Sequence, residues 1–154
     1  MISIQTEDFD TGAEVRALQG NGSTGAIVSF TGLVRDLASH GSVTAIELEH
    51  YPAMTLRSLQ QIAAEAKSRW PLTGVRVIHR IGYLAAGEQI VLVVVSSAHR
   101  HAAFEAASFI MDFLKCQAPF WKKEFINGEG HWVDAKSSDV SALQRWADNR
   151  TESA

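Results

Sequence analysis

Hydrophobic and polar positions repeat along the chain with two different periods, and these periods predict its elements. Alternating or short continuous apolar runs predict strands at 2–6, 25–34, 44–51, 75–83 and 89–98, and a last hairpin at 120–125 and 131–133 around a turn at 127–130. Helical spacing predicts helices at about 10–18, 52–70, 100–117 and 141–149. Strands joined by short turns and interspersed with two long helices indicate an α+β domain, in which a mostly antiparallel sheet packs on those two helices.

Each long helix is predicted to pack through one apolar face. The stripe of the first helix consists of Leu56, Leu59, Ala63, Ala66 and Trp70, and that of the second consists of Ala103, Phe104, Ala107, Ile110, Met111 and Leu114. Glu65 and Arg69 have the spacing of an i,i+4 ion pair. The strand at 89–98 is apolar on both faces, which predicts a central strand that is covered on both sides.

The composition predicts one folded domain in a reducing compartment. The 154 residues are 46% hydrophobic, so we expect a single domain over 1–154, with a core at about 2–146 and a short flexible C-terminal tail. A net charge of −3 argues against a nucleic-acid partner, so any basic site must be local. There is no signal-peptide pattern, the longest apolar run (90–95) is too short to span a membrane, and the single cysteine excludes an internal disulfide. We therefore expect a cytoplasmic protein.

The first candidate site lies where the strand at 89–98 gives way to the second long helix. His99 and Arg100 stand at this junction, and backbone N–H groups at a helix N-terminus attract anions. The planar guanidinium of arginine donates two parallel hydrogen bonds to a phosphate. The junction is therefore a candidate phosphate site, although a solvent-exposed His and Arg without a role would give the same pattern.

Two lysines near the end of the second long helix are the candidate reactive groups. Lys115 falls at the margin of the apolar stripe, where partial desolvation favours the neutral amine, a nucleophile or base. A lysine whose stem packs while its ammonium reaches water is the alternative. The segment after Pro119 turns back, so Lys122 is expected near Lys115, and two close ammonium groups lower each other's proton affinity.

Three further features of the sequence are candidate sites. Arg35 follows the strand at 25–34, where Gly32 would let the backbone approach a ligand, and an exposed loop without a role is the alternative. His99 and His101 face different ways and no Cys/Asp cluster accompanies them, so no metal site is expected. Cys116 adjoins Lys115, but its position about 100° round the helix favours a structural thiol over a persulfide carrier.

Six segments together form a pattern that extends over about residues 2–146. They are Gly25–Asp36, Leu48–Tyr51, His79–Gly82, Ser97–Arg100, Phe109–Lys115 and Ala118–Glu124. In their order and spacing they resemble one family, the large catalytic subunit of molybdopterin synthase. The resemblance implies an α/β hammerhead fold and a homodimer in which each copy binds a small ubiquitin-like sulfur-carrier subunit at an outer end, giving a heterotetramer.

The same resemblance implies the reaction. The carrier's C-terminal Gly-Gly thiocarboxylate would enter the pocket, and two sulfurs would be added to cyclic pyranopterin monophosphate to form the dithiolene of molybdopterin. No cofactor, nucleic acid or membrane is expected to take part. The lysine matching Lys115 would be the main catalytic residue, and the lysine matching Lys122 would assist it. The residues implied in substrate binding are Leu33, Val34, Arg35, His99, Arg100, Lys123, Glu124 and Lys136.

One of these positions departs from the family pattern. Lys136 stands where an arginine is expected to reach across the dimer, and lysine keeps the charge but loses the bidentate fork. Two other functions remain open from the residues alone. A persulfide sulfurtransferase would depend on Cys116 rather than Lys115, and a binding module would capture a phosphorylated ligand or a partner's tail without turnover.

Overall fold

The computed structural model describes residues 1–20, 22–36, 43–133 and 143–147. Its first sheet has the order β1-β4-β6-β2 and its second the order β5-β3-β7-β8. The strands are β1 (Ile2–Gln5), β2 (Ala26–Leu33), β3 (Val43–His50), β4 (Leu72–Arg80), β5 (Gly82–Ala85), β6 (Gln89–Ser97), β7 (Phe120–Ile126) and β8 (Glu129–Val133). Only the β1–β4 pair is parallel among the described strands, which confirms the predicted α+β class with mostly antiparallel pairing.

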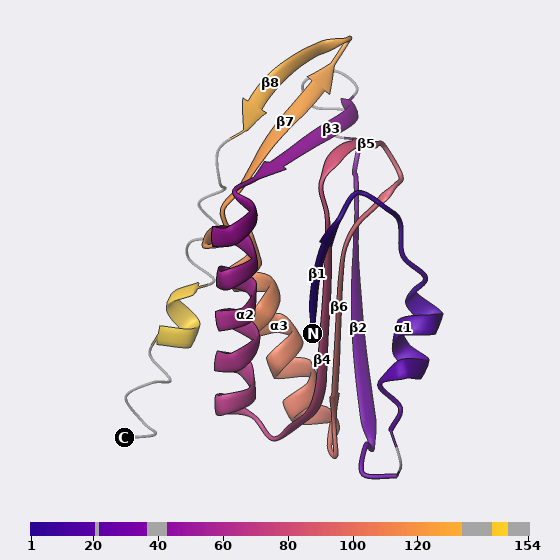
Figure 1. Ribbon diagram of the computed structural model, residues 1–154, viewed down its shortest axis with the longest axis vertical. Coiled ribbons are helices and arrows are strands. Elements are labelled where there is room, and N and C mark those ends of the chain that lie inside the picture. The colour runs from indigo at the N-terminus through magenta and orange to yellow at the C-terminus, as the bar shows by residue number, and fades with distance from the viewer. Residues whose placement is uncertain (21, 37–42, 134–142, 148–154) are drawn as a thin grey trace.

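Three named helices complete the fold: α1 (Thr11–Ala17), α2 (Pro52–Arg69) and α3 (Arg100–Cys116). Helices α2 and α3 cover one face of the first sheet, α1 lies against the other, and the second sheet sits at one end of the molecule (Figure 1). The chain enters the second sheet from β2, from β4 and from the end of α3. The junction between the two sheets is therefore where three separate parts of the sequence meet.

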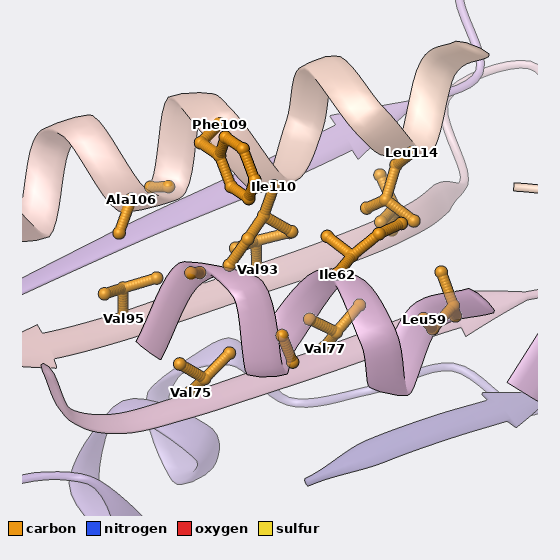
Figure 2. Packing of buried hydrophobic residues seen from close by; sticks show 14 of the residues in the cluster. Leu59, Ile62, Val75, Val77, Val93, Val95, Ala106, Phe109, Ile110 and Leu114 are labelled. Carbon is orange, nitrogen blue, oxygen red and sulfur yellow. The ribbon is translucent and has the colours of Figure 1, made fainter. Parts of the chain in front are cut away.

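Strand β6 is buried on both faces, as its continuous apolar sequence predicts. Val93 and Val95 point toward α2 and α3, where they meet Ile62, Phe109 and Ile110 (Figure 2). The alternate residues of β6 pack on the α1 side of the sheet, in a cluster that contains Ile78, Leu92 and Val94, with Phe9, Val15, Leu18 and Ile27 against it. Because helices cover both faces, no position of β6 needs a polar side chain.

The helices have the predicted bounds within a residue, but two predicted core residues are wrong. Leu56 of α2 is 39% exposed and Phe104 of α3 is 61% exposed. The buried positions are Thr55, Leu59, Ile62, Ala63 and Ala66 in α2 and Ala102, Ala103, Ala106, Ala107, Phe109, Ile110 and Leu114 in α3. Each buried stripe is centred less than one residue's rotation (about 100°) from the predicted one, which is enough to leave Leu56 and Phe104 outside it. The predicted ion pair between Glu65 and Arg69 is confirmed at 3.0 Å.

The run predicted as one strand at 75–83 is in fact two strands in different sheets. Strand β4 ends at Arg80, and β5 begins at Gly82, whose φ of +86° is a conformation that favours glycine. The buried guanidinium of Arg80 holds this corner, since it donates to the carbonyls of Thr6 at 3.0 and 3.1 Å and of Gln89 at 2.9 Å. Residue alternation continues through the corner, so the pattern alone could not reveal it.

The last hairpin is tighter than predicted. Its turn consists of Asn127 and Gly128 alone, both with positive φ (52° and 83°), and β8 already begins at Glu129. This is the two-residue turn that Asn-Gly favours, because its twist matches that of the strands.

The C-terminal segment packs against the two long helices. Residues 143–147 are helical, within the predicted 141–149, and the remainder of that range lies outside the described residues. Trp146 is 1% exposed, its ring meets Trp70 and Phe109 edge-on, and Arg69 donates to its carbonyl at 3.0 Å. Across the described part of the chain, no helix is long and apolar enough to cross a membrane.

Candidate functional site

The predicted anion-binding and reactive residues lie at opposite ends of α3. His99 is the residue that precedes the helix and Arg100 is its first residue, whereas Lys115 lies in the last turn. At about 1.5 Å per residue, Arg100 and Lys115 are separated by about 22 Å along the axis. One copy of the chain therefore does not bring His99 and Arg100 together with Lys115. A single basic pocket that contains all of these residues stays a prediction, and within one chain the length of α3 keeps them apart.

The start of α3 has the electrostatics of an anion site. Among its described residues the first turn holds no acidic side chain, and His99 makes no side-chain cap to the helix. Both His99 and Arg100 are exposed. The N–H groups of a first helical turn carry a partial positive charge, which Arg100 adds to. A phosphate would meet donors from the backbone and from Arg100 there.

The other candidate residues gather at the opposite end of the first sheet. Leu33 ends β2 beside Gln89, the first residue of β6, and Arg35 follows it. At this same end His79 pairs with Val91, and the positive charge of Lys115 is one of the causes that lower the pKa of His79. The end of β2, which precedes Arg35, and the end of α3, which contains Lys115, thus lie toward the same end of the molecule, where the two sheets join (Figure 1).

Lys115 is more exposed than the sequence predicts. Its side chain belongs to the exposed class, on the same outward margin of α3 as Phe104. Within this chain, therefore, burial does not supply the desolvation that would favour its neutral amine. A molecule that covered this lysine would exclude water from it.

Lys122 and Glu124 share one face of β7. Their side chains lie 3.6 Å apart as an ion pair, with the lysine 37% exposed and the carboxylate 16% exposed. Strand alternation also places Phe120 on this face. The carboxylate restricts where the Lys122 ammonium can lie.

Lys123 lies on the opposite face of β7 from Lys122. It is directly opposite Glu47 of β3 and Trp132 of β8, and its Nζ lies over the rings of Phe125 at 5.7 Å and Trp132 at 5.6 Å. Trp132 is 59% exposed, so this is an outer aromatic face of the second sheet. Lys122 and Lys123 therefore cannot contact one small ligand from the same side of β7.

The residues after β2 are held by the loop before β6. The N–H of Val34 donates to the carbonyl of Glu88 at 2.9 Å, and the carbonyl of Val34 accepts from Gly87 at 2.8 Å. Val34 is buried, whereas Leu33 is 54% exposed and Arg35 is exposed. The backbone at this point is fixed, so the guanidinium of Arg35 starts from a rigid base.

The remaining predictions concern cysteine, metal and Lys136. Cys116, at the end of α3, is half-buried and forms no disulfide. In the described part of the chain, no three His, Cys, Asp or Glu side chains are grouped so that they could hold a metal ion. Lys136 lies outside the described residues.

A groove of about 230 Å³ between α2 and α3 is lined by Ser58, Gln61, Ile62, Glu65, Phe109, Phe113 and Gln117, none of which was predicted as a site residue.

Two histidines at the sheet junction were given no role by the sequence reasoning. His79 is buried at the end of β4, and its ring lies against Phe120 with centroids 3.9 Å apart. The Nδ1 of His50 is buried and has no hydrogen-bond partner among the residues that the structure describes. The signal that could have found His79 is an imidazole at a position where the strand pattern requires a core residue.

Comparisons with known proteins identify the family. The sequence profile described as MoaE protein matches residues 4–117. The molybdopterin synthase catalytic subunit of Mesorhizobium japonicum is 56% identical over 148 residues, which cover 94% of this chain and 92% of that protein. The solved molybdopterin biosynthesis MoaE protein from Burkholderia ambifaria is 51% identical with a TM-score of 0.81, covering 96% of this chain and 97% of that one.

A more distant neighbour shares the fold. It is a chain in the complex of subunits 1 and 2 of molybdopterin-converting factor from Helicobacter pylori, with a TM-score of 0.73 at 22% identity, covering 88% of this chain and 92% of that chain. The family match and the identity of the relatives decide the assignment. The chain belongs to the MoaE family of molybdopterin synthase catalytic subunits, which act in molybdenum cofactor biosynthesis.

Proposed function

We propose that this chain transfers sulfur from the thiocarboxylated C-terminus of a small ubiquitin-like carrier subunit to cyclic pyranopterin monophosphate, forming the dithiolene of molybdopterin. Family membership supports the reaction class. The observation that carries the assignment of roles is that Lys115 and Lys122 flank one turn, which connects α3 to β7 at the junction of the sheets. Two amines held on either side of a fixed turn can act on one substrate.

Lys115 is the main catalytic residue of this proposal, and Lys122 assists it. A positioned lysine moves protons as the thiocarboxylate attacks the pterin, while the neighbouring cations stabilise the charge that develops. Glu124 holds the Lys122 ammonium through their ion pair. Arg35, on its fixed backbone, supplies a guanidinium for an anionic group of the substrate.

The substrate site is completed by a second copy of the chain. Within one copy, α3 keeps His99 and Arg100 about 22 Å from Lys115, so these residues serve the same substrate only if His99 and Arg100 come from the partner subunit. A symmetric dimer meets this requirement, because an antiparallel arrangement places the start of one α3 beside the end of the other.

Strand β2 has the features of the contact between the copies. It is one of the two edge strands of the first sheet, and its eight residues, Ala26–Leu33, carry no charge. Long uncharged edge strands readily pair with another chain. Ala26 lies beside Ser97, next to His99, whereas Leu33 is next to Arg35. Antiparallel pairing of two β2 edges would therefore bring Arg35 of one subunit toward the partner subunit's His99 and Arg100.

The carrier subunit is the second partner. The Helicobacter pylori neighbour was solved as a complex of two subunits, which supports a small-subunit partner here. The C-terminal tail of the carrier must reach Lys115. Binding of that tail would also cover this exposed lysine and lower its hydration. We place the heterotetramer in the cytoplasm, the compartment that the single cysteine favours.

Reconstitution at neutral pH tests the reaction. The protein is mixed with thiocarboxylated carrier and cyclic pyranopterin monophosphate, and dithiolene pterin is assayed for the wild type, Lys115→Ala and Cys116→Ser. We expect product from the wild type and from Cys116→Ser, and none from Lys115→Ala. Loss of product only with Cys116→Ser would establish a persulfide mechanism instead. Ligand binding by the wild type without any product would leave a binding module as the better account.

A further inference from the structure

His79 is a buried titratable side chain that the proposed reaction does not use. It is 8% exposed, and burial lowers the pKa of its imidazole to about 4, so the ring is neutral at physiological pH. Its neighbour Arg80 is also buried, and it donates to the carbonyls of Thr6 and Gln89. For packing alone, an apolar side chain would serve better at this position.

The hydrogen bond and the stacking of His79 fix its ring completely. Nδ1 lies 2.9 Å from the carbonyl oxygen of Arg80, and because a carbonyl can only accept, Nδ1 carries the proton. The lone pair of the neutral ring is therefore on Nε2. One ring face lies against Phe120, at 3.9 Å and 17° from parallel. Phe120 in turn stacks with His50, its direct neighbour on β3, at 6.3 Å and 27°.

These three rings join the two sheets. His79 belongs to β4 in the first sheet, whereas Phe120 and His50 belong to β7 and β3 in the second. The turn before Phe120 is held as well, since Thr55 donates to the carbonyl of Pro119 at 3.3 Å. The start of β7 is therefore fixed relative to β4 by the stacked rings.

Both candidate catalytic lysines depend on this stack for their position. Phe120 is five residues after Lys115 and two before Lys122, on the same face of β7 as Lys122. Lys115 is close enough to His79 for its charge to lower the pKa of the imidazole, after burial, which lowers it most. His50 is the other titratable group that acts on the ring in this way.

We infer that His79 is a positioning residue for sulfur transfer, whose neutral imidazole clamps Phe120 and so holds the segment that carries Lys115 and Lys122. The inference rests on the proposed function for its reaction, but the positioning itself does not require turnover. A histidine suits the task because its Nδ1–H sets the plane of the ring, while its neutral state adds no positive charge beside Lys115.

The test compares His79→Leu, which removes the stacked ring, with His79→Phe, which keeps a flat ring, and with Val77→Ala. Val77 is a buried residue of the same strand, so Val77→Ala controls for lost stability. Single-turnover sulfur transfer is measured at saturating carrier and substrate, with carrier affinity measured separately. We expect His79→Leu to lower the rate at least tenfold at unchanged carrier affinity, His79→Phe to recover part of it, and Val77→Ala to stay within twofold of the wild type.

A double-mutant cycle separates positioning from general loss of structure. If His79 acts through the lysines, His79→Leu should lower the single-turnover rate by a much smaller factor in a Lys122→Ala background than in the wild type. The inference would be overturned if His79→Leu lowered the rate by the same factor in both backgrounds, or if folded His79→Leu kept the wild-type rate.

NMR of 13C-labelled lysine side chains gives a readout that needs no activity. We expect His79→Leu to shift or broaden the signals of Lys115 and Lys122 and to leave that of Lys67, on α2, unchanged. Unchanged Lys115 and Lys122 signals would refute the positioning role even in a protein that proved inactive. Conversely, if the wild type transfers no sulfur but His79→Leu still shifts the lysine signals, only the proposed reaction is refuted. Should His79→Leu fail to fold, Phe120→Leu, which removes the other ring of the same stack, carries the same comparisons.

Discussion

The imidazole ring of His79 lies nearly parallel to the phenyl ring of Phe120, with 3.9 Å between their centroids and 17° between their planes. This contact joins the end of a strand in one sheet to the start of a strand in the other. Its energetic consequence is a dependence of stability on pH. Burial lowers the pKa of His79 from 6.5 to about 4, so between these values the unfolded chain binds a proton that the folded protein does not.

Stability should therefore fall as the pH is lowered from 6.5 toward 4. The linkage predicts that His79 makes the free energy of unfolding lower by about 2 kcal/mol at pH 5 than at pH 7.5. Urea unfolding of the wild type and of His79→Phe at both pH values measures this difference. The variant should lose less stability on acidification than the wild type by that amount, and equal losses would contradict a buried neutral imidazole.

Mixed dimers test whether two subunits share each site. Arg100→Ala and Lys115→Ala should each be inactive, yet a heterodimer of the two would contain one site in which Lys115 and the partner subunit's Arg100 are both intact. Random mixing after unfolding and refolding should restore about one quarter of wild-type activity. If each chain used its own Arg100, every site would carry a defect and mixing would restore nothing.

The ion pair between Lys122 and Glu124 should matter for rate rather than for stability. Because the lysine is 37% exposed, Glu124→Gln should change the free energy of unfolding by less than about 1 kcal/mol. Because the Lys122 ammonium is then no longer held, the rate of single-turnover sulfur transfer should fall severalfold, with carrier affinity unchanged. Glu129→Gln, which alters the weak 4.0 Å contact to His131 on the exposed hairpin, is the matched control and should leave the rate as it is.

Two glycines provide a matched pair for testing the backbone near the start of α3. A Cβ at Gly25 would lie 2.2 Å from the carbonyl oxygen of Ala98, and a Cβ at Gly130 would lie 2.2 Å from Cε of Lys123. The first contact is with backbone and the second with a flexible side chain. We expect Gly25→Ala to lower the free energy of unfolding by about 1–3 kcal/mol and Gly130→Ala by less than about 1 kcal/mol.

The same pair distinguishes the two ends of the site. Gly25→Ala should also weaken phosphate or substrate binding, since Ala98 precedes His99 and must move. Gly130→Ala should instead change the fluorescence of Trp132, because Lys123 leaves its ring. Similar losses of stability from both substitutions, measured by urea unfolding, would contradict the rigid approach of Gly25 to Ala98.

The sequence by itself determined the elements, because their periodicity is a local property. The covered strand β6 and the bounds of α2 and α3 follow from residue patterns within single segments. The family pattern was also readable from the segments in order, including those with Lys115 and Lys122. The length of α3 was readable too, and with it the distance that separates Arg100 from Lys115.

Only the tertiary structure decided which faces are buried and which residues meet. Leu56 and Phe104 are exposed although both fit the helical spacing, because that spacing specifies the buried face of a helix only to within about one residue, and packing on the sheet decides the rest. The strand pattern continues through Gly82 although the chain changes sheets there, since alternation does not record its pairing partner. The contact of His79 with Phe120 joins residues 41 positions apart, and such a pairing arises from the packing of two sheets, which no local pattern encodes.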